Sequence, residues 1–319
     1  MGVKIAGLGK AVPKMVLSNE KLSERVDTSD EWIRSRTGIE NRCIAVTETT
    51  EQLATSAALE AISAAGIEAH NIELVIVATV SPDTTMPSTA CLVARNIGAD
   101  RATCFDITAA CSGFVFASEV AISMMNQGGY QNALVIGAEV LSKMLDWEDR
   151  GTCVLFADGA GAVLYTKSEE NQILAIETGS NPKGADQITL PAGVGNHTFY
   201  QVEERKQTIQ MSGRDVYVFA TTKVPESIRK VLEKAQLTPE EIAVYILHQA
   251  NSRIMDNVAQ KLGVPKEHFF KNLSHYGNTS AASIPMALYD AKALLKSGDK
   301  IILSGFGAGL TWGTMLLEW

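Results

Sequence analysis

The chain has few of the residues that build covalent or metal-bound scaffolds. Among its 319 residues are five cysteines and five histidines, and no two cysteines form a Cys-x-x-Cys pair. An odd number of cysteines without paired spacing argues against both a disulfide framework and a structural zinc site. The same usage is typical of a reducing compartment. We therefore expect a cytoplasmic protein with no bound metal.

Long apolar runs and an excess of positive charge are also missing. No hydrophobic run is long enough to span a bilayer. The opening residues, Met-Gly-Val-Lys-Ile-Ala, lead into no apolar block of the signal-peptide kind, so we expect no membrane insertion. A formal net charge of −8 argues against general binding to nucleic acids or anionic membranes. The remaining composition, 46% hydrophobic and 20% charged, is ordinary for a globular enzyme with a substantial core.

Continuous Val/Ile/Leu runs alternate with helical stretches along the chain. The clearest runs cover residues 74–78, 133–136, 244–247 and 300–303. Strands without polar alternation are typical of a sheet covered by helices on both faces. The alternation of such strands with helices predicts an α/β fold.

The order of these elements repeats. A strand, a polar turn that starts a helix and a second strand follow one another between Val77 and Val135. The same order recurs between Leu247 and Ile302, displaced by roughly 170 residues. The repetition predicts two similar halves, which we place at residues 1–168 and 169–319, on either side of a polar stretch near the midpoint of the chain.

Cys111 follows an extended run, 104–108, and precedes a long apolar stretch, 114–125, whose only charged residue is Glu119. This stretch is predicted to be a buried helix. A thiol at the N-terminus of such a helix meets the positive end of the helix dipole, which stabilises thiolate. The placement therefore predicts a lowered thiol pKa and a nucleophilic cysteine.

Two later segments supply polar partners for such a sulfur. His248-Gln-Ala-Asn251 follows a predicted strand, and Gly277-Asn-Thr-Ser-Ala-Ala-Ser283 precedes a predicted helix. A thiol, an imidazole (His248) and a carboxamide (Asn278), each at a turn before a helix, indicate an acyl-transfer site. The other histidines, His70, His197, His268 and His275, have no comparable neighbours.

These segments closely resemble the condensing enzymes of the thiolase superfamily, specifically the β-ketoacyl-[acyl-carrier-protein] synthase III family. Six motifs occur in the order of the family: Asp30-Glu-Trp-Ile-Arg-Ser-Arg-Thr-Gly-Ile39, Ala-Ala-Cys111-Ser-Gly, the segment 150–162, His248-Gln-Ala-Asn, Gly277-Asn-Thr-Ser-Ala, and the segment 305–313. The resemblance covers essentially the whole chain. It implies a five-layered αβαβα thiolase fold and a homodimer. It also implies the first condensation of type II fatty-acid synthesis, between an acyl-CoA primer and malonyl-ACP, with both compounds as substrates and no cofactor.

The resemblance assigns a role to each polar group. Cys111 attacks the primer thioester and holds the acyl group. His248 and Asn278 donate hydrogen bonds to the enolate that forms when malonyl-ACP loses CO2. The backbone N–H groups of Cys111 and Ala308 receive the oxyanion of the second step. Gly305-x-Gly-x-Gly309 is no dinucleotide motif, because too little chain follows it for a helix and a second strand.

Two binding surfaces also follow from the resemblance. The entrance for CoA is assigned to a set that combines an indole, two guanidinium groups and small polar residues: Thr28, Trp32, Arg36, Arg150, Gly213 and Asn251. The carrier-protein surface is assigned to the start and the cationic face of a helix: Gln249, Ala250, Asn251, Ser252, Arg253 and Lys261. Met86 lies where the family places a residue that reaches into the acyl pocket of the partner subunit. We hypothesise that this pocket accepts branched or longer primers.

Two alternatives remain open at this point. A synthase of the same fold that makes polyketide starters or quinolones shares the Cys-His-Asn set, so the three residues do not exclude it. A scaffolding subunit without activity is the other alternative, and it is disfavoured because such proteins lose the nucleophile.

Overall fold

The computed structural model describes residues 2–191 and 207–319, and His197 lies outside this range. The strands are β1 (Gly2–Ala11), β2 (Met15–Ser18), β3 (Asn41–Ile44), β4 (Leu74–Ala78), β5 (Thr103–Ile107), β6 (Asn132–Val140), β7 (Asp158–Ser168), β8 (Ile173–Ser180), β9 (Ile188–Thr189), β10 (Gln210–Met211), β11 (Val244–Leu247), β12 (Lys300–Gly307) and β13 (Thr311–Glu318). The helices are α1 (Asn19–Ser23), α2 (Asp30–Thr37), α3 (Thr50–Ala65), α4 (Thr89–Ile97), α5 (Gly113–Gly128), α6 (Gly213–Ala235), α7 (Ser252–Leu262), α8 (Leu273–Tyr276) and α9 (Ser283–Ala291). Short 3₁₀ turns are η1 (Ala69–Asn71), η2 (Ala110–Ser112), η3 (Leu141–Met144), η4 (Pro182–Gln187), η5 (Pro239–Glu241), η6 (Lys266–His268), η7 (Ser280–Ala282) and η8 (Lys292–Leu294).

Two sheets form the frame of the molecule, and they repeat one strand order. The first sheet has the order β1-β7-β6-β4-β5, and the second has the order β8-β13-β12-β11. In both, the central parallel pair (β4 with β6, β11 with β12) continues into an antiparallel pair. A parallel bridge from Tyr245 to Phe269 lies where β5 would pair in the second sheet. The four runs expected to be strands all lie within strands, so the predicted α/β fold with two similar halves is confirmed.

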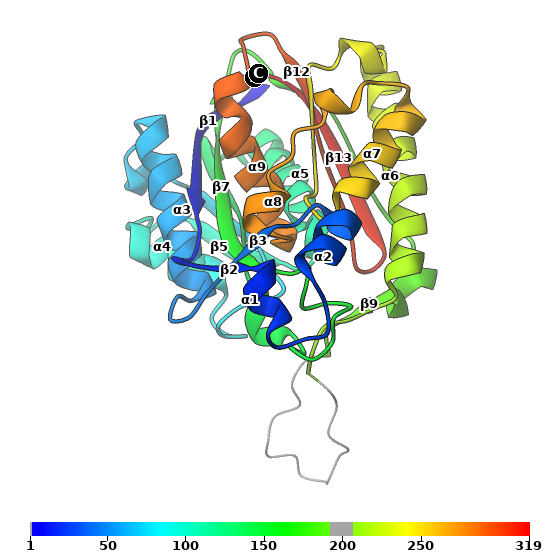
Figure 1. Cartoon of the computed structure of the whole chain (residues 1–319). Coiled ribbons are helices and arrows are strands. Elements are labelled where there is room, and N and C mark those ends of the chain that lie inside the picture. Colours follow the sequence, from blue (N-terminus) through cyan, green and yellow to red (C-terminus); the bar gives the residue numbers. More distant parts are fainter. Residues whose placement is uncertain (1, 192–206) are drawn as a thin grey trace.

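Five layers stack across the molecule, as Figure 1 shows. Helices α3 and α4 cover the outer face of the first sheet, α5 and α9 lie between the sheets, and α6 and α7 cover the outer face of the second sheet. The middle position of α5 explains its composition, because a helix between two sheets has little surface left for water. Phe114, Val115 and Met125 are buried there. The expected thiolase-like αβαβα arrangement is therefore present, and the apolar helix after Cys111 is buried as predicted.

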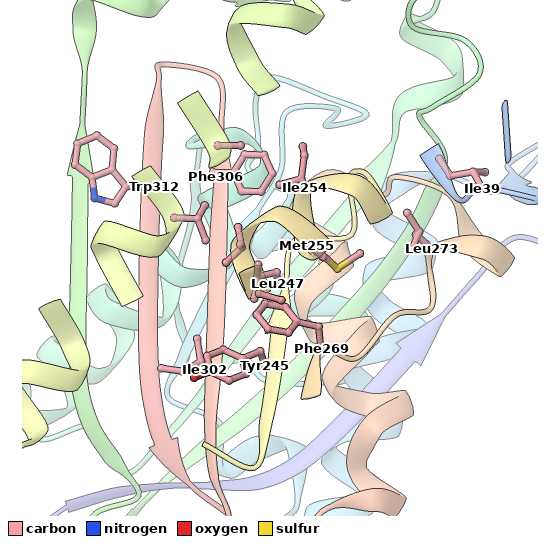
Figure 2. Close-up of a cluster of buried hydrophobic side chains, with 14 of the residues drawn as sticks. Ile39, Tyr245, Leu247, Ile254, Met255, Phe269, Leu273, Ile302, Phe306 and Trp312 are labelled. Atoms are coloured by element: carbon pink, nitrogen blue, oxygen red, sulfur yellow. The ribbon is translucent and has the colours of Figure 1, made fainter. Parts of the chain in front are cut away.

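The apolar cluster beneath the second outer layer holds the strand end that carries His248. Figure 2 shows Tyr245 and Leu247 of β11, Ile254 and Met255 of α7, and Ile302 and Phe306 of β12 in one apolar cluster. The Tyr245 and Phe269 rings stack with centroids 4.7 Å apart. Burying each such side chain contributes on the order of 1.5–3 kcal/mol to folding. This buried cluster therefore holds the start of the loop after β11 in place.

The close approach of η7 to the first sheet depends on a glycine. A Cβ added to Gly137 of β6 would lie 2.2 Å from the Ala281 carbonyl oxygen. We expect Gly137→Ala to lower the free energy of unfolding by about 1–3 kcal/mol or more, because backbone atoms would have to move apart. Denaturant unfolding measures this. Gly213→Ala is the control, since its added methyl meets no atom closer than 3.8 Å. An equal effect of both changes would contradict this packing.

Candidate active site

A single apolar cavity brings most of the predicted site residues together. Its volume is about 370 Å³, and it is lined by groups from both halves of the chain. Cys111, His248 and Asn278 all face this cavity, although they are far apart in the sequence. Of the other predicted residues, Trp32, Arg36, Arg150, Gly213, Ala250, Asn251 and Ala308 also line it. The rest of the lining is mostly aliphatic, with Val80, Leu141, Val154 and Ile209 among the contributors.

Cys111 lies in the 3₁₀ turn η2, which leads from β5 into α5. Its side chain is 9% exposed, enough to reach the cavity but mostly enclosed. Burial raises the pKa of this thiol to about 12, and the interaction with the Ser280 hydroxyl lowers it only in part. The predicted lowering of the thiol pKa is therefore wrong. Burial of the sulfur, together with the nearby Glu139 carboxyl, opposes the thiolate more strongly than the Ser280 hydroxyl and the backbone N–H stabilise it.

The Nδ1 atom of the His248 ring is bound by Ser283. The Ser283 hydroxyl lies 2.6 Å from Nδ1, and Ser283 Oγ also accepts a hydrogen bond from the Gln249 backbone N–H at 3.4 Å. When the hydroxyl donates to Nδ1, the ring proton resides on Nε2, and His248 then offers an N–H donor at that nitrogen.

We expect His248 to stay neutral throughout the working pH range. Burial lowers its pKa from 6.5 to about 3. Below about pH 6.5 the ring takes up a proton in the unfolded chain but not in the native protein. The contribution of this group to the free energy of unfolding is therefore fully present above about pH 6.5. That contribution is lost, by about 1.4 kcal/mol per pH unit, as the pH falls toward 3. An NMR titration should show no ring shift between about pH 8 and 5, with His248→Gln used to assign the signal. A ring that titrates near pH 6.5 would contradict the assignment.

Asn278 is oriented by its own loop. Its backbone N–H donates to Leu155 O at 2.9 Å, and its backbone carbonyl accepts from the Ala157 N–H at 2.8 Å. Oδ1 of the side chain accepts from the Ser280 N–H at 2.9 Å. With Oδ1 occupied on the loop side, the Nδ2 group is the part of the amide left to donate toward the cavity.

The end of β12 approaches the backbone of Cys111 closely because residue 307 has no side chain. A Cβ at Gly307 would lie 2.9 Å from Cys111 N and 3.0 Å from Cys111 Cβ. Ala308 follows at the rim of the cavity. This contact places the two predicted backbone donors, the N–H groups of Cys111 and Ala308, on neighbouring segments.

An indole and two exposed guanidinium groups lie close together in the lining of the cavity. The guanidinium carbon of Arg150 lies 5.4 Å from the Trp32 ring centroid, and that of Arg36 lies 6.0 Å from it. Asn251 links this group to α7, because its Nδ2 donates to Arg36 O at 3.1 Å and its Oδ1 accepts from the Arg253 N–H at 2.8 Å. Such a group of flat cationic and aromatic surfaces suits an adenine ring and phosphates.

Thr28 and Gln249 do not take the places expected of them. Thr28 does not line the cavity, and its buried hydroxyl has no hydrogen-bond partner within the described residues. Gln249 is 1% exposed, and its side-chain amide binds Leu247 O, Phe270 O and the Asn272 N–H. A buried amide cannot contact a docked protein. Its assignment to the carrier-protein surface is therefore corrected to a structural role that anchors the loop after β11.

Two of the remaining residues assigned to the carrier protein, Arg253 and Lys261, are exposed cations on α7. The Lys261 ammonium group donates to Thr221 O at 2.8 Å. Lys271, which the sequence interpretation missed, pairs with Asp256 and donates to Ser252 Oγ at 2.8 Å. The negative charge of Asp256 is therefore balanced locally. Lys271 lies nine residues past the end of α7, so helical spacing gave no signal for it.

Two further residues act on the site without having been predicted. Ser283 binds Nδ1 of His248, and Phe306 places its ring 5.2 Å from the His248 ring, edge to face. Both residues lie inside quoted motifs. Their distance from His248 in the sequence left no pattern that connects them.

The comparisons with known proteins agree with this geometry. The family model "3-Oxoacyl-[acyl-carrier-protein (ACP)] synthase III" matches residues 105–182, and the model of its C-terminal region matches residues 232–319. A β-ketoacyl-[acyl-carrier-protein] synthase III of Clostridium acetobutylicum is 49% identical over 99% of this chain and 98% of its own length. The chain belongs to the β-ketoacyl-[acyl-carrier-protein] synthase III family. It is thereby an enzyme of the acyltransferase class.

Solved structures of the family have the same fold. The 3-oxoacyl-[acyl-carrier-protein] synthase III of Aquifex aeolicus is 46% identical, with a TM-score of 0.93 over 100% of both chains. The priming β-ketosynthase of the R1128 polyketide pathway is 32% identical, with a TM-score of 0.94 over 99% of this chain and 96% of its own. The match to the R1128 enzyme is consistent with the polyketide alternative.

Within residues 2–191 and 207–319, no group of three or more His, Cys, Asp or Glu side chains is arranged to hold a metal ion. No helix in the same described part of the chain has the length and apolar character needed to cross a membrane.

Proposed function

We propose that this chain uses Cys111, His248 and Asn278 to condense an acyl-CoA primer with malonyl-ACP, which yields 3-oxoacyl-ACP, CoA and CO2. The observation that carries the proposal is that these three side chains line one apolar cavity whose lining also includes Trp32 and Arg150. Acyl-CoA and malonyl-ACP are substrates in this scheme, and no cofactor takes part. The condensation initiates type II fatty-acid synthesis.

The first half-reaction loads the acyl group. The Cys111 sulfur attacks the primer thioester, the carbonyl oxygen gains negative charge, and the N–H groups of Cys111 and Ala308 stabilise that charge. CoA leaves as the thioester carbonyl re-forms on Cys111. Splitting the transfer in this way replaces one difficult step by two easier ones.

The second half-reaction uses the two side-chain donors. Malonyl-ACP loses CO2, and the charge on its thioester oxygen is met by His248 Nε2–H and Asn278 Nδ2–H. Because both donors are neutral and fixed by Ser283 and Ser280, little reorganisation is needed when the charge develops. The enolate carbon then attacks the acyl-Cys111 carbonyl. Losing one such donor typically costs about 3–4 kcal/mol of barrier.

The carrier protein would approach the cavity over α7. Support comes from the exposed Arg253 and Lys261, together with Lys271, which cancels the charge of Asp256. Arg253 and Lys271 lie at the start of α7, next to Ala250 and Asn251, which line the cavity, whereas Lys261 lies in the last turn of the helix. An acidic carrier can thus be guided to the entrance although the chain as a whole carries a net charge of −8.

A homodimer belongs to the same proposal. Strand β5 is the last strand of the first sheet, so one of its edges is unpaired within the described chain, and it carries the apolar residues Phe105 and Ile107. Unpaired edges of this kind are suited to pairing with a second copy. Met86 is 85% exposed, as expected for a side chain that a partner subunit covers.

The hypothesis that the acyl pocket beside Met86 accepts branched or longer primers is tested with a panel of acyl-CoA primers. Strict preference for acetyl-CoA would reject that hypothesis.

We also propose that the two halves meet between residues 168 and 169. This is supported by the end of β7 at Ser168 and the start of β8 at Ile173, which join different sheets.

The competing function is priming of a polyketide pathway, which the similarity to the R1128 enzyme favours. The test is a condensation assay with malonyl-ACP and malonyl-CoA as alternative extenders. The proposed function predicts 3-oxoacyl-ACP with malonyl-ACP and little product with malonyl-CoA. Turnover of malonyl-CoA without any turnover of malonyl-ACP would overturn it. The absence of turnover with both extenders would favour a scaffolding subunit.

A further inference from the structure

The proposed mechanism uses two backbone donors that belong to different halves of the chain. The Cys111 N–H lies in η2, and the Ala308 N–H lies in the turn that joins β12 to β13. Both groups can bind one oxyanion only while their two segments keep a fixed spacing, because each donor must lie about 2.7–3.1 Å from the charged oxygen. The mechanism therefore requires a contact that holds η2 and this turn together.

Two hydroxyl groups lie between the two segments and contact each other, although 199 residues separate them in the sequence. Thr311 Oγ1 is 2.7 Å from Ser112 Oγ and 2.8 Å from Ala308 O. Both hydroxyls also reach Ala109 O, at 3.4 Å from Thr311 and at 2.8 Å from Ser112. Ser112 directly follows Cys111 and is 0% exposed. When the Ser112 hydroxyl donates to Thr311 Oγ1 and the Thr311 hydroxyl donates to Ala308 O, two hydrogen bonds in series join the segments.

The backbones of η2 and β12 touch because two residues of β12 have no side chain. A Cβ at Gly305 would lie 2.9 Å from Ser112 Cα, and one at Gly307 would lie 2.9 Å from Cys111 N. This packing sets how near the two segments come. Packing is not directional, however, whereas a hydrogen bond weakens steeply when its angle changes. The contact between Ser112 and Thr311 therefore adds a direction that the glycines cannot supply.

Backbone contacts hold the other side of the turn. Gly307 pairs with Thr311 in the ladder between β12 and β13. Leu310 O accepts from the Asn181 N–H at 2.7 Å, and the Leu310 N–H donates to Asn181 O at 3.1 Å. These bonds fix the turn relative to β12 and to the end of β8. The two hydroxyls then relate that fixed position to η2.

We propose that Ser112 and Thr311 are positioning residues that hold the N–H groups of Cys111 and Ala308 at the spacing that an oxyanion needs. The inference rests on the proposed function and deepens it. Neither Ser112 nor Thr311 lines the cavity, so both act through the backbone of their neighbours. Their effect belongs to the steps in which an oxyanion forms at the acyl carbonyl. Binding of acyl-CoA, which uses other groups, does not depend on them.

The test measures acylation in single turnovers at increasing concentrations of acyl-CoA, without an extender. Thr311→Ala and Thr311→Ser both remove the methyl group, and Thr311→Ser keeps the hydroxyl. In Thr311→Ala the maximum rate should fall by about 10–10²-fold, because misplacing a group by about 1 Å can cost about 10²-fold. The acyl-CoA concentration that gives half the maximum rate should change by less than about twofold, since ground-state binding is intact. Thr311→Ser should acylate within about threefold of wild type.

Two further variants separate positioning from stability. Ser112→Ala removes the other hydroxyl and should lower the maximum rate less, because Thr311 keeps its own contacts with backbone oxygens. Thr314→Ala is the matched control. Thr314 lies on β13, is 0% exposed, and its Oγ1 is 2.8 Å from both Ser227 Oγ and Ser304 Oγ. Its change should lower the free energy of unfolding and leave acylation within about twofold of wild type. Thermal unfolding identifies any variant that is unfolded at the assay temperature.

The outcomes separate this inference from the proposed function. A wild-type maximum rate in Thr311→Ala, or equal losses in Thr311→Ala and Thr311→Ser, would overturn the role of the hydroxyls and leave the proposed function standing. An unchanged maximum rate with weaker acyl-CoA binding would overturn it as well. If Thr311→Ala is unfolded, acylation by Ser112→Ala at the wild-type rate contradicts the inference in the same way. A wild-type enzyme that never becomes acylated would instead defeat the proposed function.

Discussion

Cys111→Ala is expected to reduce condensation to background, a loss of at least about 10⁴-fold, because no other group of the cavity can hold the acyl chain as a thioester. The measurement is formation of 3-oxoacyl-ACP from acyl-CoA and malonyl-ACP. The protein should still fold, since replacing a thiol by hydrogen at a small buried side chain leaves only a small void.

Cys91→Ala is the matched control for this change. Cys91 is exposed on α4 and does not line the cavity. Its removal should leave condensation within about twofold of wild type, because surface changes away from a site have small effects. Substantial condensation by the Cys111→Ala enzyme would mean that another residue carries the acyl group.

Asn278→Asp is expected to lower the rate of condensation by about 10²–10³-fold while acylation of Cys111 stays within a few-fold of wild type. The change keeps an oxygen that can accept from the Ser280 N–H, so the loop conformation is preserved. It replaces the Nδ2 donor with an oxygen that cannot stabilise an enolate. Rapid-quench assays of the two half-reactions separate the effects.

Asn278→Ala serves as the comparison for this prediction. It removes the donor and also the contact with Ser280, so its condensation should be no better than that of Asn278→Asp. If both half-reactions slow equally in the Asp variant, the role of Asn278 in decarboxylation is wrong. Such a result would point to a general loss of cavity shape.

The sequence predicted the frame of the molecule well because its signals are local. The strands β4 and β11 coincide with the Val/Ile/Leu runs at 74–78 and 244–247, since a fully buried strand needs little beyond a short continuous apolar run. The repeated order of elements was visible for the same reason. The backbone repeats in the same way at the two turns η2 and η7. Ala110 and Ser280, the first residues of these turns, both have the left-handed conformation, with φ of 46° and 48°.

The electrostatics of the site could not be read in the same way. A helix N-terminus is visible in the sequence, but the number of apolar atoms around Cys111 is not, and burial decided the direction of its pKa shift. Gln249 looked like a surface residue beside His248, yet three backbone groups hold it inside. Ser283 binds His248 from a position 35 residues further along the sequence, and that separation hides the contact.

The most direct test of the central claim is to map the adduct formed when the wild-type protein is mixed with acyl-CoA in the absence of extender. Peptide mass spectrometry should find one acyl group per chain, on the peptide that contains Cys111. Acylation of Cys43, Cys91, Cys104 or Cys153 instead, or no covalent adduct at all, would contradict the account.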